Sequence, residues 1–290
     1  MPPGIRALAY AAMCARLVLA QARTGKPVPE FIHGDECLFC HRSDIGNQWR
    51  KNRHGLTIRQ REDAPELTRL LDGSVFGGEV DYFLGSRANV RFLRKDGYGN
   101  FSIRTPGGWN RLRFGERCAG CHSTGVDSQT KTFSAFGLDC YVCHGDASLD
   151  HTKAVSPMLL SKKRPLDAKV VTSICAQCHL RGGQSRATGL PYANNFTAGE
   201  DLFKDYEFNF AKADDAAIPG GERHVYRNVR DVLREGLETT CVSCHRVHSP
   251  PGNRHRFVLT SPVCADCHNA AGPKRDVKAY KVEHSAVCEY

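Results

Sequence analysis

The sequence predicts a mainly α-helical chain with much irregular loop and one small β-hairpin insertion at about residues 60–117. Three observations predict this class. Three segments have the character of short helices, and one of them carries its apolar residues on a single stripe. Stretches rich in glycine, proline and polar residues separate those segments. Alternating apolar residues stand in the longest interval between copies of a repeated cysteine motif.

Three segments of the sequence are expected to form helices. Residues 43–54 are expected to form a helix with Ser43 as its N-cap, and residues 167–180 a second helix. Residues 223–237 are expected to form a third. Its apolar residues fall on one stripe: Val225, Val229, Val232 and Leu233.

The hairpin is predicted from two alternating segments, residues 80–84 and 100–104. Gly97 and Gly99 mark the expected turn before the second segment.

Cysteine is the unusual feature of the composition, with 14 Cys and 13 His in 290 residues. Twelve of the cysteines form six Cys-x-x-Cys pairs, and His follows each pair directly. The motifs are Cys37/Cys40/His41, Cys118/Cys121/His122, Cys140/Cys143/His144, Cys175/Cys178/His179, Cys241/Cys244/His245 and Cys264/Cys267/His268.

This spacing is typical of c-type haem attachment. Two thiols three positions apart lie on one face of a helical turn, where they can form thioethers with the vinyl groups of one porphyrin. The following His then points back under the ring and supplies the proximal iron ligand. Zinc sites and disulfides are the alternatives, but neither requires His after every pair. The sequence therefore predicts six covalent haems c that fill the core of an otherwise loop-rich chain.

Export follows from this chemistry, because haem is attached to thiols where proteins are exported. Arg6, the apolar residues 7–20 and an Ala-x-Ala pattern ending at Ala22 predict a signal peptide at 1–22, which would remove Cys14. A multihaem cytochrome c domain is expected over 30–290. No other stretch reaches the length of a membrane span, so we expect a periplasmic or extracellular protein, soluble or peripheral to a membrane complex. Cys288 is left over as a free thiol or the mark of a covalent partner.

The formal net charge of +9 does not predict nucleic-acid binding. Six haems bring about twelve propionates, which offset most of this charge. Arg42, Arg181 and Arg246 closely follow haem motifs and are expected to pair with propionates. Redox proteins are the expected partners.

Histidine is also abundant outside the motifs, and these histidines can supply the distal ligands of the haem irons. Met158 is the one methionine left beyond the predicted signal peptide, so Met/His ligation is limited to one haem at most. Seven histidines are available for six irons: His33, His54, His151, His224, His248, His255 and His284. We therefore expect mostly bis-His, low-potential haems.

Several segments resemble the cytochrome c-554 family (the cytochrome c-552/4 domain). CLFCHRSDIGNQWRKNRH, from Cys37, matches a haem motif followed by a Trp and a His, which implies that His54 is a distal ligand. CAGCHSTGVD and GLDCYVCHGDASLDH are similar to the next two blocks, and the latter implies His151 as a ligand. His224, upstream of CVSCHRVH, and His248 match a later block. The resemblance covers residues 31–270, and His33, His255 and His284 match none of its motifs.

Two function classes remain. An electron carrier is favoured, because the histidine supply suffices to close every iron and leaves no site for substrate. The alternative is an oxidoreductase acting on a small nitrogen or sulfur species at one open haem, with His255, Arg254, Arg256 or Tyr141 nearby for protons and charge. The chain lacks the Cys-x-x-Cys-Lys variant. A subunit of an extracellular conductive filament would use the same bis-His wiring.

Overall fold

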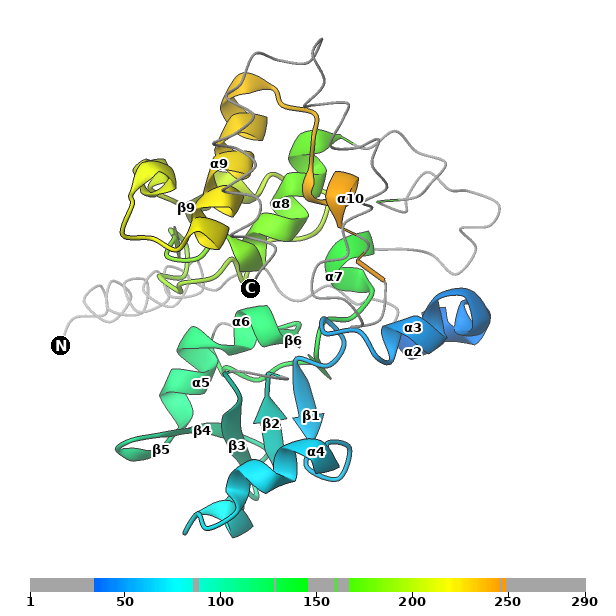
Figure 1. Ribbon diagram of the computed structural model, residues 1–290, viewed down its shortest axis with the longest axis vertical. Helices are drawn as coiled ribbons and strands as arrows, with labels where there is room; N and C mark the ends of the chain where they lie inside the picture. The colour runs from blue at the N-terminus through cyan, green and yellow to red at the C-terminus, as the bar shows by residue number, and fades with distance from the viewer. Residues whose placement is uncertain are drawn as a thin grey trace, which may run out of the picture.

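The computed structural model describes residues 34–85, 89–127, 129–145, 160, 167–245 and 247–248. An antiparallel sheet lies at one end of the molecule and the two longest helices of this part of the chain, α8 and α9, at the other (Figure 1). The short helices α6 and α7 lie between them (Figure 1). The α-helices are α2 (Gly34–Cys40), α3 (Asn47–Trp49), α4 (Pro65–Thr68), α5 (Arg111–Arg117), α6 (Ala119–His122), α7 (Tyr141–His144), α8 (Ala168–His179), α9 (Gly220–Glu235) and α10 (Cys241–Cys244).

The sheet has five antiparallel strands in chain order. In its central pairs Phe83 lies opposite Phe92, and Leu93 opposite Ile103. Gly99, with φ +84, lies in the turn between the third and fourth strands, where the sequence predicts a turn. The strands are β1 (Ile58–Gln60), β2 (Tyr82–Leu84), β3 (Arg91–Lys95), β4 (Phe101–Thr105) and β5 (Gly108–Asn110).

This sheet shows that the prediction of a mainly α fold with a small hairpin is wrong. The described chain is mixed α and β, and the two strands expected at 80–84 and 100–104 are separated by β3. Arg91 and Lys95 bound β3 and obscure its apolar alternation. Both faces of the sheet are covered, so Phe83 and Leu84 are buried on opposite faces, and simple in–out periodicity is lost.

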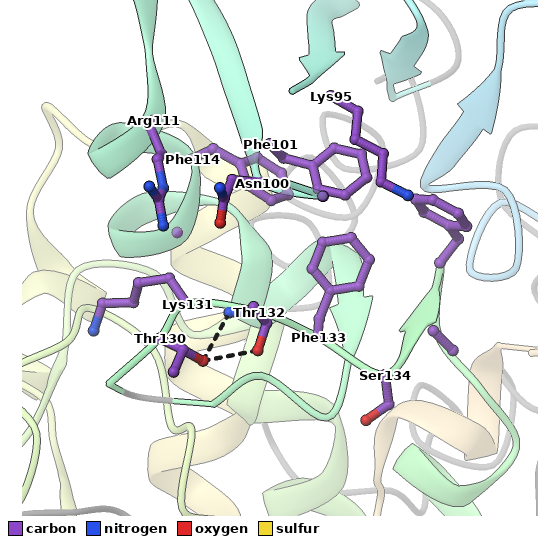
Figure 2. Close-up of a pocket in the computed structure, with 14 residues that line it drawn as sticks. Lys95, Asn100, Phe101, Arg111, Phe114, Thr130, Lys131, Thr132, Phe133 and Ser134 are labelled. Carbon is purple, nitrogen blue, oxygen red and sulfur yellow. Dashed lines mark hydrogen bonds between the residues drawn. The ribbon is translucent and has the colours of Figure 1, made fainter. Parts of the chain in front are cut away.

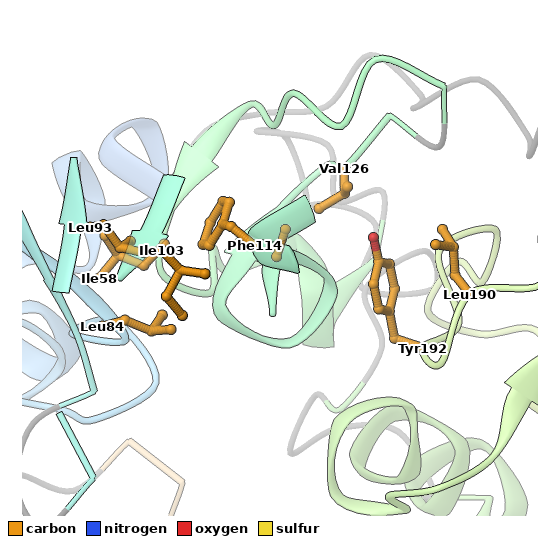
Figure 3. Close-up of a cluster of buried hydrophobic side chains, with 9 residues drawn as sticks. Ile58, Leu84, Leu93, Ile103, Phe114, Val126, Leu190 and Tyr192 are labelled. Carbon is orange, nitrogen blue, oxygen red and sulfur yellow. The ribbon is translucent and has the colours of Figure 1, made fainter. Parts of the chain in front are cut away.

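Side chains of the described residues form three buried hydrophobic clusters, whereas the sequence predicts a core filled by haem. Figure 3 shows the cluster between the sheet and α5, in which Phe114 packs near Ile103 and Leu93. Tyr192 enters the same cluster from a later segment, and its hydroxyl donates to the carbonyl of Gly115 at 2.5 Å. A second cluster, around Phe83 and Leu67, covers the opposite face.

The third cluster joins α8 and α9. Two of the predicted helices are confirmed here. Asp167 caps α8 by accepting from the backbone N–H groups of Lys169 and Val170. Val229 and Val232 are buried along α9, as the predicted stripe requires, and Gly236 ends that helix in the left-handed conformation at φ +68.

The helix predicted at 43–54 is shorter and differently wound. A π-helical turn, η1 (Arg42–Gly46), follows His41, and α3 adds one short turn. His41 rather than Ser43 is the N-cap, and no side chain caps this end. This segment therefore lacks a side-chain N-cap like the one that Asp167 provides at the start of α8.

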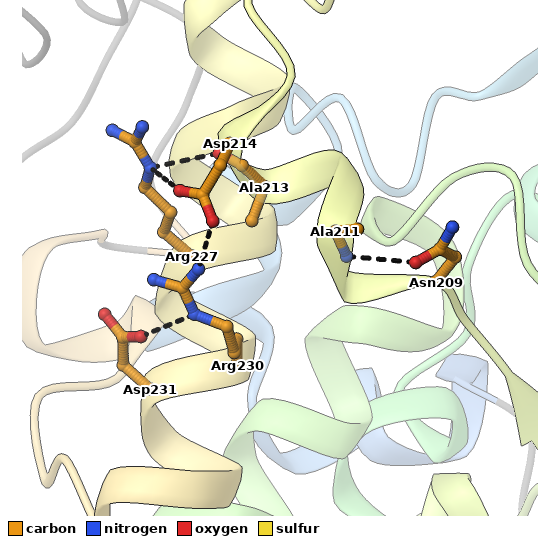
Figure 4. A network of polar contacts seen from close by, with 7 residues as sticks. All are labelled: Asn209, Ala211, Ala213, Asp214, Arg227, Arg230 and Asp231. Carbon is orange, nitrogen blue, oxygen red and sulfur yellow. Dashed lines mark hydrogen bonds and ion pairs between the residues drawn. The ribbon is translucent and has the colours of Figure 1, made fainter.

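Short elements complete the helical end. The 3-10 helices η4 (Leu202–Lys204) and η5 (Phe210–Asp214) pack on α8 and α9, respectively. Figure 4 shows Asp214 between two arginines of α9. Arg230 donates to it at 2.9 Å, and Nε of Arg227 lies 3.5 Å from it while donating to the carbonyl of Ala213 at 3.0 Å.

The remaining short elements are single turns and two-residue strands. They are the 3-10 helices η2 (Arg69–Leu71) and η3 (Gly77–Glu79) and the paired strands β6 (Ser123–Thr124) with β7 (Ala135–Phe136) and β8 (Gln184–Ser185) with β9 (Tyr206–Glu207). Within the described residues, no helix is long and apolar enough to cross a membrane. The predicted signal peptide at 1–22, Met158 and Cys288 lie outside the described residues, as do the ends of the 30–290 domain.

Candidate cofactor-attachment site

The cysteine pair of each of the five described Cys-x-x-Cys-His motifs lies on a helical turn, as the spacing predicts. Helix α2 carries Cys37 and Cys40, and the last turn of α8 carries the motif that ends at His179. Helices α6, α7 and α10 are each little more than one motif. The sixth motif, Cys264/Cys267/His268, lies outside the described residues.

His245, the predicted iron ligand of the fifth motif, lies just beyond the helical turn that carries its cysteines. In the structure α10 ends before His245, whose backbone is extended, with φ −105 and ψ 128, and the residue is exposed. Helix α10 is a single turn, closed by the N–H of His245 donating to the carbonyl of Cys241 at 2.8 Å, so the chain leaves the helix at this residue. His245 contributes to the lowered pKa of His179, and its role as an iron ligand stays a prediction.

Glycine within the second motif is required by packing. A Cβ atom on Gly120 would come within 1.9 Å of the Tyr192 ring. Tyr192 is buried and belongs to the cluster that joins α5 and α6 to the sheet. Glycine at position 120 therefore allows the second motif to pack closely against the core.

Thiols of different motifs contact one another in pairs. Cys37 is hydrogen-bonded to Cys140, Cys121 to Cys178, and Cys175 to Cys241. These hydrogen bonds lower the pKa of the accepting thiols, Cys37, Cys121 and Cys241, and raise the pKa of their partners. Among the described cysteines other than Cys244, none forms a disulfide.

Helix α8 is where these contacts converge. It packs against α6, α7 and α10. Its Gln177 amide donates to the carbonyl of Val142, on α7, at 3.4 Å. The two thiols of α8 contact α6 through Cys178 and α10 through Cys175. With the Cys37–Cys140 contact, all five described motifs form one connected group.

The contacts between motifs do not follow the order of the motifs along the chain. The motifs at 118 and 140 are close in sequence, but their thiols are not paired with each other. The structure instead pairs Cys121 with Cys178 and Cys140 with Cys37. The motif that follows the one at 241 starts at Cys264, outside the described residues.

The described motif histidines include two that burial keeps in the neutral form. Desolvation lowers the pKa of His122, and it lowers the pKa of His179 to about 4, with nearby Arg181 contributing in both cases. Neutral imidazole is the form that ligates iron. Nδ1 of His122 is buried without a hydrogen-bond partner among the described residues. At the exposed motif, Nδ1 of His41 lies 3.0 Å from Asp44, which orients the ring.

Two predicted distal histidines lie beside motif histidines. The ring centres of His54 and His179 are 6.2 Å apart, with 73° between the ring planes. Those of His144 and His248 are 5.8 Å apart, with 24° between the planes. Desolvation lowers the pKa of both His54 and His248, although His248 is the more exposed of the two. His224 lies on α9, and His33, His151, His255 and His284 are outside the described residues.

Asn52 is a site residue that the sequence did not single out. It is buried, and its Oδ1 accepts from the backbone N–H of His54 and lies 3.2 Å from Nδ1 of the same residue. Its Nδ2 donates to the carbonyl of Val247 at 2.5 Å. The sequence could have pointed to Asn52, because it is a short polar residue two positions before the candidate ligand His54.

The donor set fits haem c. Paired thiols stand on helical turns, a neutral histidine follows them in the α8 motif, and further neutral histidines lie within reach. The described residues contain no group of three or more His, Cys, Asp or Glu side chains that could hold a bare metal ion.

A cavity of about 220 Å³ lies apart from these motifs (Figure 2). Phe101, Phe114 and Phe133 line it, together with the cations Lys95 and Arg111. No motif residue borders it. For the oxidoreductase alternative, Tyr141 lies on α7, whereas His255, Arg254 and Arg256 are outside the described residues.

Comparison with known proteins gives one similar solved structure. No family model matches the chain, and no curated protein matches it. The chain is similar to an undecahaem cytochrome from the S-layer of Carboxydothermus ferrireducens, with 17% identity and a TM-score of 0.45. The similarity covers 85% of this chain and 44% of that protein.

Proposed function

We propose that this chain is a c-type cytochrome with six covalently attached haems, which relays electrons between redox partner proteins outside the cytoplasm. The observation that carries the proposal is the connected group of motifs around α8. Three thiol contacts and the packing of α7 on α8 link segments that are far apart in sequence. An electron relay needs adjacent carriers, and this arrangement supplies adjacent attachment sites.

The residues of each motif have separate roles in this proposal. The two cysteines would bond the porphyrin through thioethers, and the histidine would ligate the iron from one side. When bound, haem iron carries one electron by alternating between its ferric and ferrous states. Distal ligation by histidine would close the irons and favour low potentials. The roles of His245 and of Cys264, Cys267 and His268 follow from their motifs alone.

Other parts of the proposal rest on the sequence. Thioether attachment and the segment 1–22 support export to the periplasm or cell exterior. The blocks over residues 31–270 support membership of the cytochrome c-554 family. Cationic side chains near the motifs, such as Arg181, support pairing with propionates.

Intact-mass measurement of the exported protein tests the cofactor count. We expect the mass of the polypeptide plus six haems, and five after Cys175→Ala/Cys178→Ala. Bare polypeptide, or polypeptide loaded with zinc, would contradict the proposal. Electron paramagnetic resonance of the oxidised protein then separates the function classes. Entirely low-spin haem supports a carrier, whereas one high-spin haem that binds cyanide readily supports the oxidoreductase.

A further inference from the structure

The separation of the two histidine pairs matches the space taken by a metal with two axial ligands. Bonds from a metal ion to imidazole nitrogen are about 2 Å long, and the ring centre lies about 1 Å behind the nitrogen, so opposed imidazoles have centres about 6 Å apart. The observed distances are 6.2 Å for His54 and His179 and 5.8 Å for His144 and His248. In each pair one member is the histidine of a haem motif and the other is outside the motifs.

Hydrogen bonding prepares His54 for this role. Oδ1 of Asn52 accepts from the backbone N–H of His54, and Nδ2 of Asn52 donates to the carbonyl of Val247. These two bonds fix the orientation of the amide. Nδ1 of His54, 3.2 Å from Oδ1, must therefore donate its proton there. Nε2 is left with a free lone pair, which is the arrangement found in metal-ligating histidines.

The same asparagine also holds the second histidine. Val247 directly precedes His248, so the Asn52 amide fixes the backbone on which His248 stands. Trp49 adds an edge contact, with its ring centre 5.9 Å from that of His248 and the planes at 81°. The segment after the first motif thus supplies one ligand and positions another.

We infer that His54 is the distal ligand of the haem iron held by His179, and that His248 is the distal ligand of the iron held by His144. This assignment rests on the proposed six-haem function, and it adds which histidine closes which iron. The haem of the α8 motif is then closed by a residue that follows the first motif in sequence. The haem of the α7 motif is closed by one that follows the fifth.

Paired substitutions in the full, exported chain test the assignment. His54→Ala should convert one low-spin ferric haem to high-spin in the electron paramagnetic resonance spectrum. The same substitution in the Cys175→Ala/Cys178→Ala background should add no high-spin haem, because the affected iron is absent. In the Cys140→Ala/Cys143→Ala background it should still add one. His248→Ala should show the reverse dependence on the two backgrounds.

A new high-spin haem from His54→Ala in the Cys175→Ala/Cys178→Ala background would overturn the first pair, and the corresponding result for His248 would overturn the second. Intact mass is measured on every sample, so absence of haem from the wild-type protein would count against the proposed function instead. If a variant does not fold, a crystal structure of the wild-type holoprotein decides. Nε2 atoms of His54 and His179 should bond to opposite sides of one iron, and any other sixth ligand would overturn the assignment.

Discussion

At the scale of single residues, Asn52 is hydrogen-bonded both to His54 and to the carbonyl of Val247. Asn52→Ala removes the acceptor for Nδ1 of His54 and the donor for the carbonyl of Val247. We expect a loss of about 1 to 3 kcal/mol in the free energy of unfolding, since the part-buried carbonyl of Val247 and the backbone N–H of His54 lose their partner. We also expect altered low-spin signals in the electron paramagnetic resonance spectrum.

Asn194→Ala is the matched control. Its Nδ2 likewise donates to a backbone carbonyl, that of Val126, at 2.9 Å. Both variants should lose stability, but only Asn52→Ala should change the spectrum. Identical spectra for Asn52→Ala and the wild type would contradict a positioning role for Asn52.

Tyr206 gives a pH-dependent prediction. Its buried hydroxyl donates to the carbonyl of Leu180 at 2.9 Å, just past the end of α8. Burial raises its pKa to about 12. A tyrosine in the unfolded chain titrates near pH 10, so its contribution to stability is complete below about pH 10 and is lost as the pH rises toward 12.

Tyr206→Phe should therefore lower the free energy of unfolding by about 1 kcal/mol near neutral pH and flatten its decline above about pH 10. Urea unfolding at several pH values measures both effects. Tyr98→Phe is the control, because Tyr98 is 94% exposed and should contribute to neither. If the free energy of unfolding of Tyr206→Phe fell as steeply above about pH 10 as that of the wild type, this prediction would be wrong.

At the scale of secondary structure, α8 depends on its N-cap. Asp167 accepts from Lys169 at 2.8 Å and from Val170 at 3.1 Å. Asp167→Ala should cost about 1 kcal/mol of stability, measured by urea unfolding, while Asp167→Asn should retain most of it. Equal stability of the Ala variant and the wild type would show that the cap contributes nothing.

The junction of α9 and η5 distinguishes ionic from apolar stabilisation. Asp214 contacts Arg230 and Arg227, but its side chain is 63% exposed, so Asp214→Asn should cost less than about 1 kcal/mol and less still in high salt. Val229 is 1% exposed, and Val229→Ala removes two buried methyl groups at a cost of roughly 2 kcal/mol. Thermal unfolding at two salt concentrations compares them, and a larger effect of Asp214→Asn would reverse this ranking.

These elements also show what local sequence can predict. Helices α8 and α9 were predicted closely because a side-chain cap, a buried stripe and a C-terminal glycine lie within their own segments. The strands β1 and β5 have three residues each and become visible only through their neighbours in the sheet. Their pairing depends on contacts between segments, which propensity does not encode.

At the scale of the whole molecule, the proposed six-haem relay places α8 at the centre of electron exchange among the haems. Removing its haem with Cys175→Ala/Cys178→Ala should slow equilibration between the haems of α6 and α10, because α8 contacts both. Cys37→Ala/Cys40→Ala removes a haem whose thiol contact is with α7 only and should leave that exchange nearly unchanged. Rapid-mixing spectroscopy after partial reduction measures the rates, and equal rates in the two variants would contradict a central role for α8.

The site as a whole was only partly predictable. The attachment cysteines follow from a local motif, so their helical turns could be predicted one by one. Which motifs meet is a property of the fold, and Cys37 with Cys140 or Cys175 with Cys241 could not be paired from spacing. Asn52 was missed for the same reason, since its importance depends on a carbonyl near the end of the described chain.

The burial of thiols between distant segments has a consequence for biosynthesis. The hydrogen bond to Cys121, together with desolvation, raises the pKa of Cys178, and desolvation raises that of Cys143 to about 11, so both thiols are poor nucleophiles in the folded chain. On the proposed attachment of haem to these cysteines, the thiols would react most readily before the chain compacts around α8, so loading with haem would precede folding.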